Sequence, residues 1–234
     1  LEKPKDPIGL PDNPGEVLAS MGNYVFDADA LAEAVTDDAV MSGSAHDMGG
    51  DIVPAFVSRG EAGVYDFRDN VVPGSTERDR GYWRDVGTMG SYYAAHMDVI
   101  APLPVFNLYN FAWPIYTSYG PQPPAKLVRG EGGLLPTAED AVLAPGVVVT
   151  GGQVFRSVLS PAVWVQSGAE VVDSVLLNDV HVGAGAVVRR AIIDKNVVVP
   201  PGARVGVDHE EDLANGFMVE DGLTVIGKGQ AFPD

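Results

Sequence analysis

The stretch VVTGGQVFRSVLSPAVWVQSGAEVVDSVLLNDVHVGAGAVVRRAIIDKNVVVPPGARV, residues 148–205, carries a repeat that decides the fold. Its aliphatic side chains recur after six, five and six residues, so that three steps span 17 residues. Neither the 3.6-residue period of a helix nor the two-residue alternation of a strand produces this spacing. On the 17-residue period three aliphatic columns and one glycine column align: Val148, Val165, Val182 and Val199; Val154, Val171, Val188 and Val205; Leu159, Leu176 and Ile193; Gly151, Gly168, Gly185 and Gly202.

A triangular coil accounts for these columns. Each side is a short strand that points one aliphatic side chain inward, and the corner glycine supplies a backbone conformation that β-branched residues resist. One such coil cannot bury its own face, so successive coils stack their strands in parallel. We therefore expect about four coils between residues 141 and 206, with a Val-rich sandwich as the alternative.

The repeat resembles the hexapeptide class, whose members form left-handed β-helices. The handedness is implied by this resemblance, because spacing alone does not define it. Hexapeptide acyltransferases use a histidine of a coil as general base. Here His181 lies next to the inward-facing Val182, so we expect its side chain to point outward at the surface.

The chain has 234 residues, a formal net charge of −17 and no cysteine. So acidic a surface repels phosphate backbones, which argues against nucleic acid as a partner. No apolar run reaches the ~18 residues that a membrane span requires, and the lack of cysteine fits a cytoplasmic location. Because the chain begins at Leu1, inside a motif, we expect a fragment of a longer protein.

The first half, residues 1–118, has the mixed pattern of an α/β domain, and residues 119–234 contain the repeat. Asp27 is a suitable N-cap for a helix. Proline becomes frequent between residues 102 and 124, which predicts an irregular linker. The elements expected before this linker are strands at 21–26 and 63–67 and helices at 28–35, 51–58 and 88–99.

Five motifs follow one another in an order found in one family. They are LEKP at 1–4, LASMGNYVF at 18–26, SAHDMGGDIVP at 44–54, YWRDVGT at 82–88, and WPIYT with PPAK within 113–126. In this order, and followed by the coil repeat, they resemble the bacterial ADP-glucose pyrophosphorylases (glucose-1-phosphate adenylyltransferases) over essentially the whole chain.

The resemblance implies a fold and an activity. The fold would be part of an α/β, Rossmann-like nucleotidyltransferase domain at 1–118, followed by a left-handed parallel β-helix domain at 119–234. The activity would be transfer of AMP from ATP to glucose 1-phosphate, giving ADP-glucose and pyrophosphate for glycogen synthesis. The family also implies Mg²⁺ as cofactor, a homotetramer and an anionic allosteric effector.

The matching motifs imply catalytic roles for Lys3 and Asp85. Lys3 would hold the phosphate of glucose 1-phosphate, and Glu2 would accept hydrogen bonds from the sugar hydroxyls. Asp85 would ligate Mg²⁺, which commonly takes one or two carboxylates together with phosphate oxygens and water. Without the resemblance, Lys3 reads as a solvated surface residue and Asp85 as the N-cap of the following helix.

The other implied sugar-binding residues are Ser20, Tyr24, Asp47 and Trp83. Three of them also have an ordinary structural interpretation: Ser20 at a strand edge, Asp47 as a helix cap and Trp83 as a core aromatic. The sequence departs from the family near Asp47, where the family more often has an aromatic residue and a lysine at positions 48 and 50 and this chain has methionine and glycine. The departure puts details of the glucose pocket in doubt and leaves the carboxylate in place.

A cationic group on the coils, formed by Arg189, Arg190 and Lys195, is a candidate effector site, with a solvated face as the alternative. The glycine-rich turns at 49–50, 130–133 and 151–152 lack the cations and the context of an ATP phosphate loop. We therefore expect the ATP side of the reaction to lie outside this chain, and the chain alone to be inactive. The four histidines are far apart in sequence and indicate no zinc site.

Three other functions stay open. Nucleotidyltransferases for another base or sugar share the general layout, and base choice is set mainly in the half that this chain lacks. A non-catalytic regulatory subunit would bind effectors and support a catalytic partner. A hexapeptide acyltransferase is disfavoured by the sugar-phosphate motifs.

Overall fold

The computed structural model describes residues 9–118 and 120–233. The chain divides into two compact units, Leu1–Asp66 and Phe67–Asp234.

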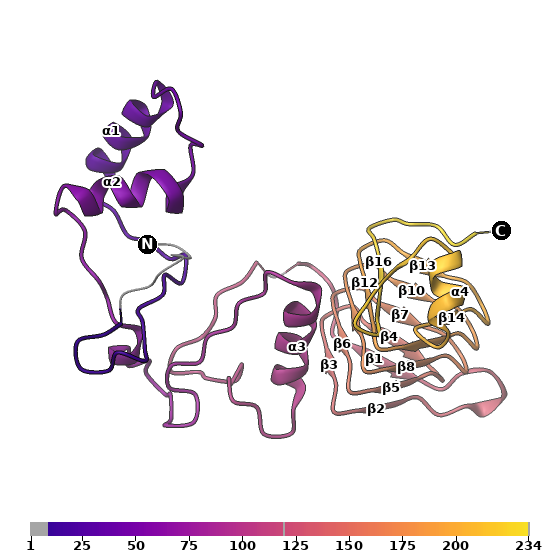
Figure 1. Ribbon diagram of the computed structural model, residues 1–234. Coiled ribbons are helices and arrows are strands. Elements are labelled where there is room, and N and C mark those ends of the chain that lie inside the picture. Colours follow the sequence, from indigo (N-terminus) through magenta and orange to yellow (C-terminus); the bar gives the residue numbers. More distant parts are fainter. Residues whose placement is uncertain (1–8, 119, 234) are drawn as a thin grey trace. The chain divides into compact units, whose positions relative to one another are not determined.

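The second unit contains a solenoid in which each coil contributes one strand to each of three parallel sheets (Figure 1). The first sheet consists of β1 (Lys126–Val128), β4 (Val148–Thr150), β7 (Trp164–Val165), β10 (His181–Val182) and β13 (Val198–Val199). The second consists of β2 (Thr137–Glu139), β5 (Gln153–Phe155), β8 (Glu170–Val172), β11 (Val187–Arg189) and β14 (Arg204–Val205). The third consists of β3 (Val142–Leu143), β6 (Val158–Leu159), β9 (Val175–Leu176), β12 (Ala191–Ile193) and β16 (Leu223–Ile226), with β15 (Met218–Glu220) antiparallel to β16.

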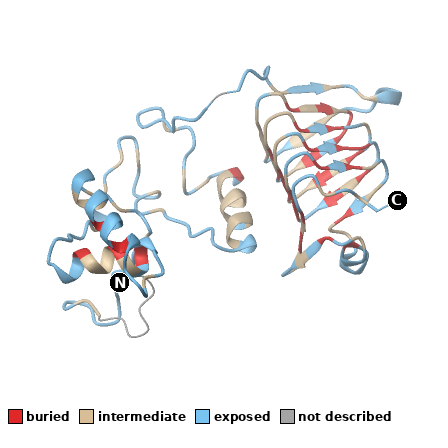
Figure 2. Ribbon diagram, turned by 90° about the horizontal axis from the view of Figure 1, so that it is seen from above, coloured by how far each residue is buried: buried red, intermediate tan, exposed pale blue. Residues whose placement is uncertain are grey.

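This arrangement confirms the predicted parallel β-helix, and its left-handedness stays a prediction. Buried residues line the inside of the solenoid (Figure 2). The predicted columns through Val154 and through Leu159 are in register from coil to coil. All of their members are fully buried. Fully burying an aliphatic side chain contributes ~1.5–3 kcal/mol, so these columns form the main core.

One member of the first predicted column is wrong. Val149, and not Val148, pairs with Val165 and is fully buried, whereas Val148 pairs with Trp164 and is half-buried. The reason is a shorter corner: only one residue separates Val149 from Gly151, whereas two separate Val165 from its corner glycine. Gly151 itself keeps its place, with a φ of 59° in the left-handed region that favours glycine.

His181 lies on the outer surface, as predicted. Its ring stacks on that of Trp164 one coil away, with centroids 5.5 Å apart and an interplanar angle of 3°. This contact gives the histidine a structural role on the outer face of the first sheet.

The last coil is interrupted by the short helix α4 (His209–Ala214) and by β15. Asp212 of α4 is fully buried. Its Oδ2 accepts hydrogen bonds from the Gly206 N–H at 2.9 Å and from the Thr224 hydroxyl at 2.7 Å. Asp212 thereby holds the inserted segment between β14 and β16.

In the first unit, α1 (Ala28–Ala39) is capped by Asp27, as predicted, and extends four residues beyond the predicted end. A π-helical turn, η1 (Met48–Ile52), continues into α2 (Val53–Ser58). A small core joins Ala34 of α1 to Ile52 and Phe56, and Phe26 packs against it. The strands predicted at 21–26 and 63–67 are wrong, since these residues form no β-ladder. A strand needs a neighbouring strand for its hydrogen bonds, and the described part of this unit provides none.

The second unit begins with the 3₁₀ turn η2 (Phe67–Asp69) and α3 (Met89–Ile100). Another 3₁₀ turn, η3 (Glu131–Gly133), lies between β1 and β2. Helix α3 packs on the outside of the third sheet, where Tyr92, Tyr93 and Met97 contact an apolar cluster of the solenoid. This packing explains why α3 belongs to the same compact unit as the solenoid. The predicted domain division at residues 118 and 119 stays a prediction.

The predicted linker is irregular over 102–118 and 120–124. No helix among the described residues is both long and apolar enough to cross a membrane.

Candidate active site

The segment 82–85 is held against α3 through the side chains of Tyr82 and Arg84, which are two residues apart. Asp98 of α3 accepts hydrogen bonds from the Tyr82 hydroxyl at 3.2 Å and from Arg84 Nε at 2.8 Å. The guanidinium of Arg84 also forms an ion pair with Asp98, with Nη2 and Oδ2 2.6 Å apart. The two residues between and after them, Trp83 and Asp85, are exposed. One side of this segment is therefore anchored, and the other presents an indole and a carboxylate.

The structure rules out one of the two roles considered for Asp85. The N-cap of α3 is Thr88, whose hydroxyl accepts a hydrogen bond from the Ser91 N–H in a capping box. Asp85 Oδ1 instead accepts a hydrogen bond from the Gly87 N–H at 3.0 Å. No described group bonds to its Oδ2, which leaves one carboxylate oxygen available.

A single carboxylate with one free oxygen, as at Asp85, fits a Mg²⁺ ion that is bound mainly by phosphate oxygens and water. The described residues contain no cluster of three histidine, cysteine or acidic side chains that could hold a metal ion. A metal at Asp85 would therefore take its other ligands from phosphate oxygens and water, as Mg²⁺ commonly does.

Two of the predicted sugar-binding residues in the first unit meet directly. The hydroxyls of Ser20 and Tyr24 are 2.7 Å apart. The Tyr24 ring is tilted against that of Phe26, with centroids 6.2 Å apart, and Phe26 packs on Phe56 of α2. The small core of this unit thus supports a pair of exposed hydroxyls.

Asp47 lies at the N-terminus of η1 and acts as its cap. Its Oδ1 accepts a hydrogen bond from the Gly50 N–H at 2.6 Å, so the capping role considered for it is confirmed. No described group bonds to Oδ2, so the cap leaves one oxygen for a ligand. A side chain at Gly50 would begin 3.1 Å from the Asp47 carboxylate.

The predicted residues fall into three groups. Ser20, Tyr24 and Asp47 belong to the first unit, and Trp83 and Asp85 belong to the second. Glu2 and Lys3 lie outside the described residues.

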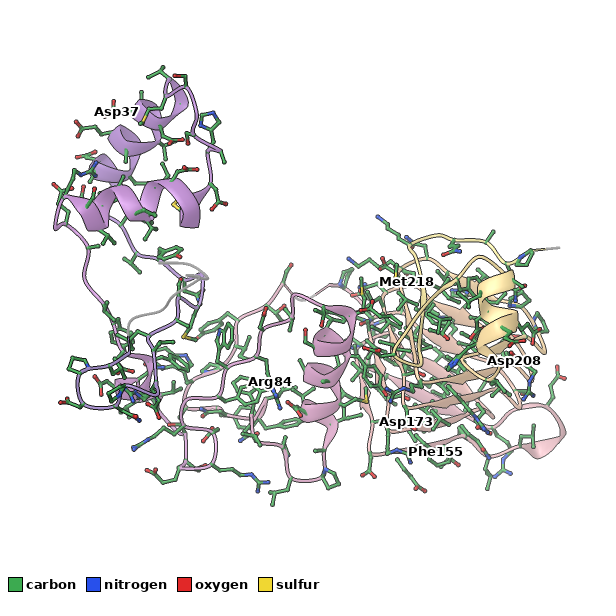
Figure 3. All side chains as sticks on the ribbon, viewed as in Figure 1. Asp37, Arg84, Phe155, Asp173, Asp208 and Met218 are labelled. Carbon is green, nitrogen blue, oxygen red and sulfur yellow. The ribbon has the colours of Figure 1, made fainter. Side chains whose placement is uncertain are left out.

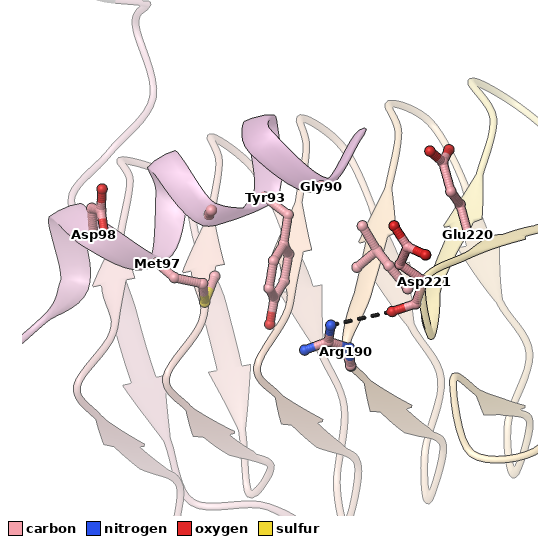
Figure 4. Close-up of a pocket in the computed structure, with 9 residues that line it drawn as sticks. Gly90, Tyr93, Met97, Asp98, Arg190, Glu220 and Asp221 are labelled. Atoms are coloured by element: carbon pink, nitrogen blue, oxygen red, sulfur yellow. Dashed lines mark hydrogen bonds between the residues drawn. The ribbon is translucent and has the colours of Figure 1, made fainter. Parts of the chain in front are cut away.

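The three candidate effector cations have different surroundings. Arg189 forms an ion pair with Glu170 of the neighbouring strand, with Nη2 and Oε1 2.6 Å apart. Arg190 donates a hydrogen bond to the Asp221 carbonyl (Figure 4). It donates another to the Gly222 carbonyl, and its guanidinium lies over the Tyr93 ring. Among the described residues no acidic group pairs with Lys195.

A shallow cleft of about 350 Å³ lies between α3 and the solenoid at Arg190, with Tyr93, Met97 and Leu223 among its lining residues. The Tyr93 hydroxyl donates a hydrogen bond to the Asp173 carbonyl at 2.8 Å. Burial, followed by the charge of Asp173, raises the pKa of Tyr93. Arg190 and Tyr93 thus connect the solenoid to the helix that follows Asp85.

Two family models match the chain in sequence. A nucleotidyl transferase model matches residues 1–101, and a GlmU-like, C-terminal hexapeptide model matches residues 123–226. The fold and both matches place the chain in the class of nucleotidyl transferases that continue into a hexapeptide solenoid.

Curated relatives identify the family. Glucose-1-phosphate adenylyltransferase of Arthrobacter sp. (strain FB24) is 60% identical over 235 residues, which cover 100% of this chain and 50% of the relative. The enzyme of the same name from Leifsonia xyli subsp. xyli is 58% identical, with 97% of this chain and 55% of the relative covered. That of Bifidobacterium longum (strain DJO10A) is 54% identical, with 100% and 56% covered. The chain belongs to the glucose-1-phosphate adenylyltransferase family and spans about half the length of these relatives.

Sequence reasoning missed the residues that support the site. Asp98 anchors the 82–85 segment, although it lies 14 residues from Arg84 and in no motif. Asp38 bonds to His46 across eight residues. The motifs contain one partner of each pair, and the other partner is recognisable only from the fold.

Proposed function

We propose that this chain carries the glucose 1-phosphate side of an enzyme that forms ADP-glucose and pyrophosphate from ATP and glucose 1-phosphate, for glycogen synthesis in the cytoplasm. The observation that carries the proposal is high identity over the whole chain to glucose-1-phosphate adenylyltransferases. The exposed carboxylate of Asp85, which is not the cap of α3, supports it.

The reaction needs charge neutralisation more than base catalysis. An ionised phosphate oxygen of glucose 1-phosphate attacks the α-phosphorus of ATP, the bond from the α-phosphorus to the bridging oxygen breaks, and pyrophosphate leaves with that oxygen. No proton has to be removed from the nucleophile, so positioning and electrostatic stabilisation supply the rate. Mg²⁺, when bound, would neutralise charge on the phosphates.

The residues of this chain then have distinct roles. Asp85 would offer Oδ2 to Mg²⁺, and Lys3 would hold the phosphate of glucose 1-phosphate. Trp83 would lie against the sugar ring. The remaining contacts to the sugar hydroxyls would come from Glu2, Ser20, Tyr24 and Asp47.

An anionic effector and a homotetramer are parts of the proposal that rest on the family resemblance. Of the three cations first considered, Lys195 is the best candidate for the effector, because Arg189 and Arg190 are engaged within the chain. The carbonyl of Lys195 accepts a hydrogen bond from the Gly229 N–H at 2.9 Å, which brings the turn containing Lys228 close to it. Lys195, which pairs with no acidic group among the described residues, would suit a phosphate-bearing ligand.

A regulatory subunit is the second candidate. It would keep the solenoid and the effector cations without needing a metal carboxylate. The intact YWRDVGT motif and the free oxygen of Asp85 favour the catalytic role.

Replacement of Lys3 tests the substrate assignment. In an enzyme made by joining this chain to the preceding segment of its relatives, Lys3→Ala should raise the KM for glucose 1-phosphate at least tenfold, because a charge-assisted contact contributes ~1.5–3 kcal/mol. The KM for ATP should change little. Lys5→Ala is the matched control and should leave both constants near the wild-type values. An equal rise of both KM values in Lys3→Ala would contradict the assignment.

A further inference from the structure

The loop 44–47, next to η1, is held by two acidic side chains, Asp51 of η1 and Asp38 of α1. Asp51 Oδ2 accepts hydrogen bonds from the Ala45 N–H at 3.2 Å and from the Asp47 N–H at 3.0 Å. Asp38, in the last turn of α1, accepts one from the Ser44 hydroxyl at 2.7 Å and one from His46 Nδ1 at 2.8 Å. Every residue of this four-residue loop is thus tied to a carboxylate.

Asp38 is placed to act as a fixed anchor. Its side chain is 11% exposed, compared with 56% for His46. Hydrogen bonds from Ser44 and then His46 lower its pKa, so the carboxylate is ionised at neutral pH. An ionised carboxylate only accepts hydrogen bonds, so His46 Nδ1 must carry the proton that joins them.

The hydrogen bond to Asp38 helps to hold an uncommon backbone conformation at His46. Its φ is 57°, in the left-handed region that non-glycine residues seldom adopt. Such a conformation persists where surrounding contacts hold it and is frequent at functional sites. Here the contacts are the bond to Asp38 and the bond from the His46 N–H to the Ser44 hydroxyl at 3.0 Å. The next residue along the chain is Asp47.

We propose that His46, fixed by Asp38, is a positioning residue that sets the place of the Asp47 carboxylate for sugar binding. Oδ1 of Asp47 is used by the Gly50 N–H, and Oδ2 has no partner among the described residues. If the loop moves, the direction of the second oxygen moves with it. His46 does not need to touch the substrate, because it acts through the peptide that it shares with Asp47. The sugar-binding part of this inference rests on the proposed function.

Three substitutions of His46 separate its hydrogen bond from its backbone conformation. Asparagine tolerates a positive φ, and its Nδ2 can donate to Asp38 as the histidine Nδ1 does. Glycine tolerates the same φ and has no donor. Alanine loses both features. We therefore expect the KM for glucose 1-phosphate to rise from the wild type through His46→Asn and His46→Gly to His46→Ala.

The kinetic test uses the chain joined to the preceding segment of its relatives. His46→Gly should raise the KM for glucose 1-phosphate roughly tenfold, because small misplacements of a binding group are costly. The KM for ATP should stay near the wild-type value, and His46→Asn should restore most of the loss. Asp38→Asn should resemble His46→Gly in direction. The neighbouring Asp37→Asn is the matched control, since Asp37 is exposed on the same helix (Figure 3). Equal changes in both KM values, or a His46→Asn variant as impaired as His46→Gly, would overturn the proposal.

Amide hydrogen exchange separates a failure of the positioning from a failure of the proposed function. In the same protein, the Ala45 and Asp47 amides should exchange faster in His46→Gly than in wild type and should regain protection in His46→Asn. This readout does not depend on which substrate the enzyme uses. Unchanged exchange in His46→Gly would show that His46 does not hold the loop. Altered exchange in a protein that makes no ADP-glucose would refute the proposed function alone.

Discussion

At the scale of single residues, the surroundings of Asp85 distinguish between the two roles that its motif allows. The sequence left two interpretations open, a metal ligand and a helix cap. Thr88 caps α3, and the 82–85 segment is tied to α3 through Asp98. The helix therefore holds Asp85 in place without using its carboxylate as a cap.

Asp85→Asn and Thr88→Ala should accordingly affect different properties, the first turnover and the second stability. In the complete enzyme, Asp85→Asn should lower kcat by orders of magnitude, because charge neutralisation at the phosphates supplies much of the rate. Its melting temperature should not change. Thr88→Ala should lower the free energy of unfolding by about 1 kcal/mol, the usual cost of losing an N-cap. Steady-state kinetics and thermal unfolding of both variants test this pair, and near-normal turnover in Asp85→Asn would contradict the metal role.

At the scale of secondary-structure elements, the regular solenoid could be predicted and the irregular parts could not. A period repeated over several coils averages out local exceptions, so two aliphatic columns and the corner glycines were predicted correctly. Val148 was misplaced because one corner is a residue shorter, which no neighbouring residue signals. The strands expected at 21–26 and 63–67 failed for another reason. An apolar run has strand propensity, but a strand forms only where a partner is available.

The solenoid core gives a direct test of the columns. Val182 and Val198 occupy neighbouring coils of the same sheet, but Val182 is fully buried and Val198 is 61% exposed. Val182→Asp buries an unpaired carboxylate and should cost several kcal/mol. Val198→Asp should change the free energy of unfolding by less than about 0.5 kcal/mol. Chemical denaturation followed by circular dichroism measures both, and similar losses in the two variants would refute the assignment of inward and outward positions.

The packing of α3 on the solenoid offers a second matched pair. Tyr92 and Tyr93 both pack on the third sheet, but only the Tyr93 hydroxyl donates a hydrogen bond to the Asp173 carbonyl. Tyr93→Phe should therefore destabilise the protein by about 1 kcal/mol, and Tyr92→Phe should be nearly neutral. Equilibrium unfolding of the two variants checks this prediction. Equal stability of the two variants would mean that the hydrogen bond contributes nothing to the attachment of α3.

At the scale of the whole molecule, charge limits how phosphates can be bound. A net charge of −17 repels anionic ligands, so binding of the proposed substrates would depend on a few placed cations and on the proposed Mg²⁺. The cations that we propose are Lys3 for the sugar phosphate and Lys195 for an effector. The sequence motifs were enough to propose Lys3, Asp85 and the sugar-binding residues. The supporting contacts from Asp38 and Asp98 required the fold, because each joins residues that no motif contains together.

We infer that this chain supplies one side of an adenylyl-transfer site. Its relatives are about twice as long, and it contains no basic glycine-rich loop suited to the ATP phosphates. Because catalysis depends on positioning both substrates, one side of a site should give no measurable rate by itself.

The most direct test measures ADP-glucose formed from ATP and glucose 1-phosphate with Mg²⁺. The chain is assayed alone, then with the preceding segment of a relative supplied as a separate polypeptide, then with that segment joined to it. We expect no product from the chain alone and product once the segment is joined. ADP-glucose formation by the chain alone, or none by the joined protein, would contradict this inference.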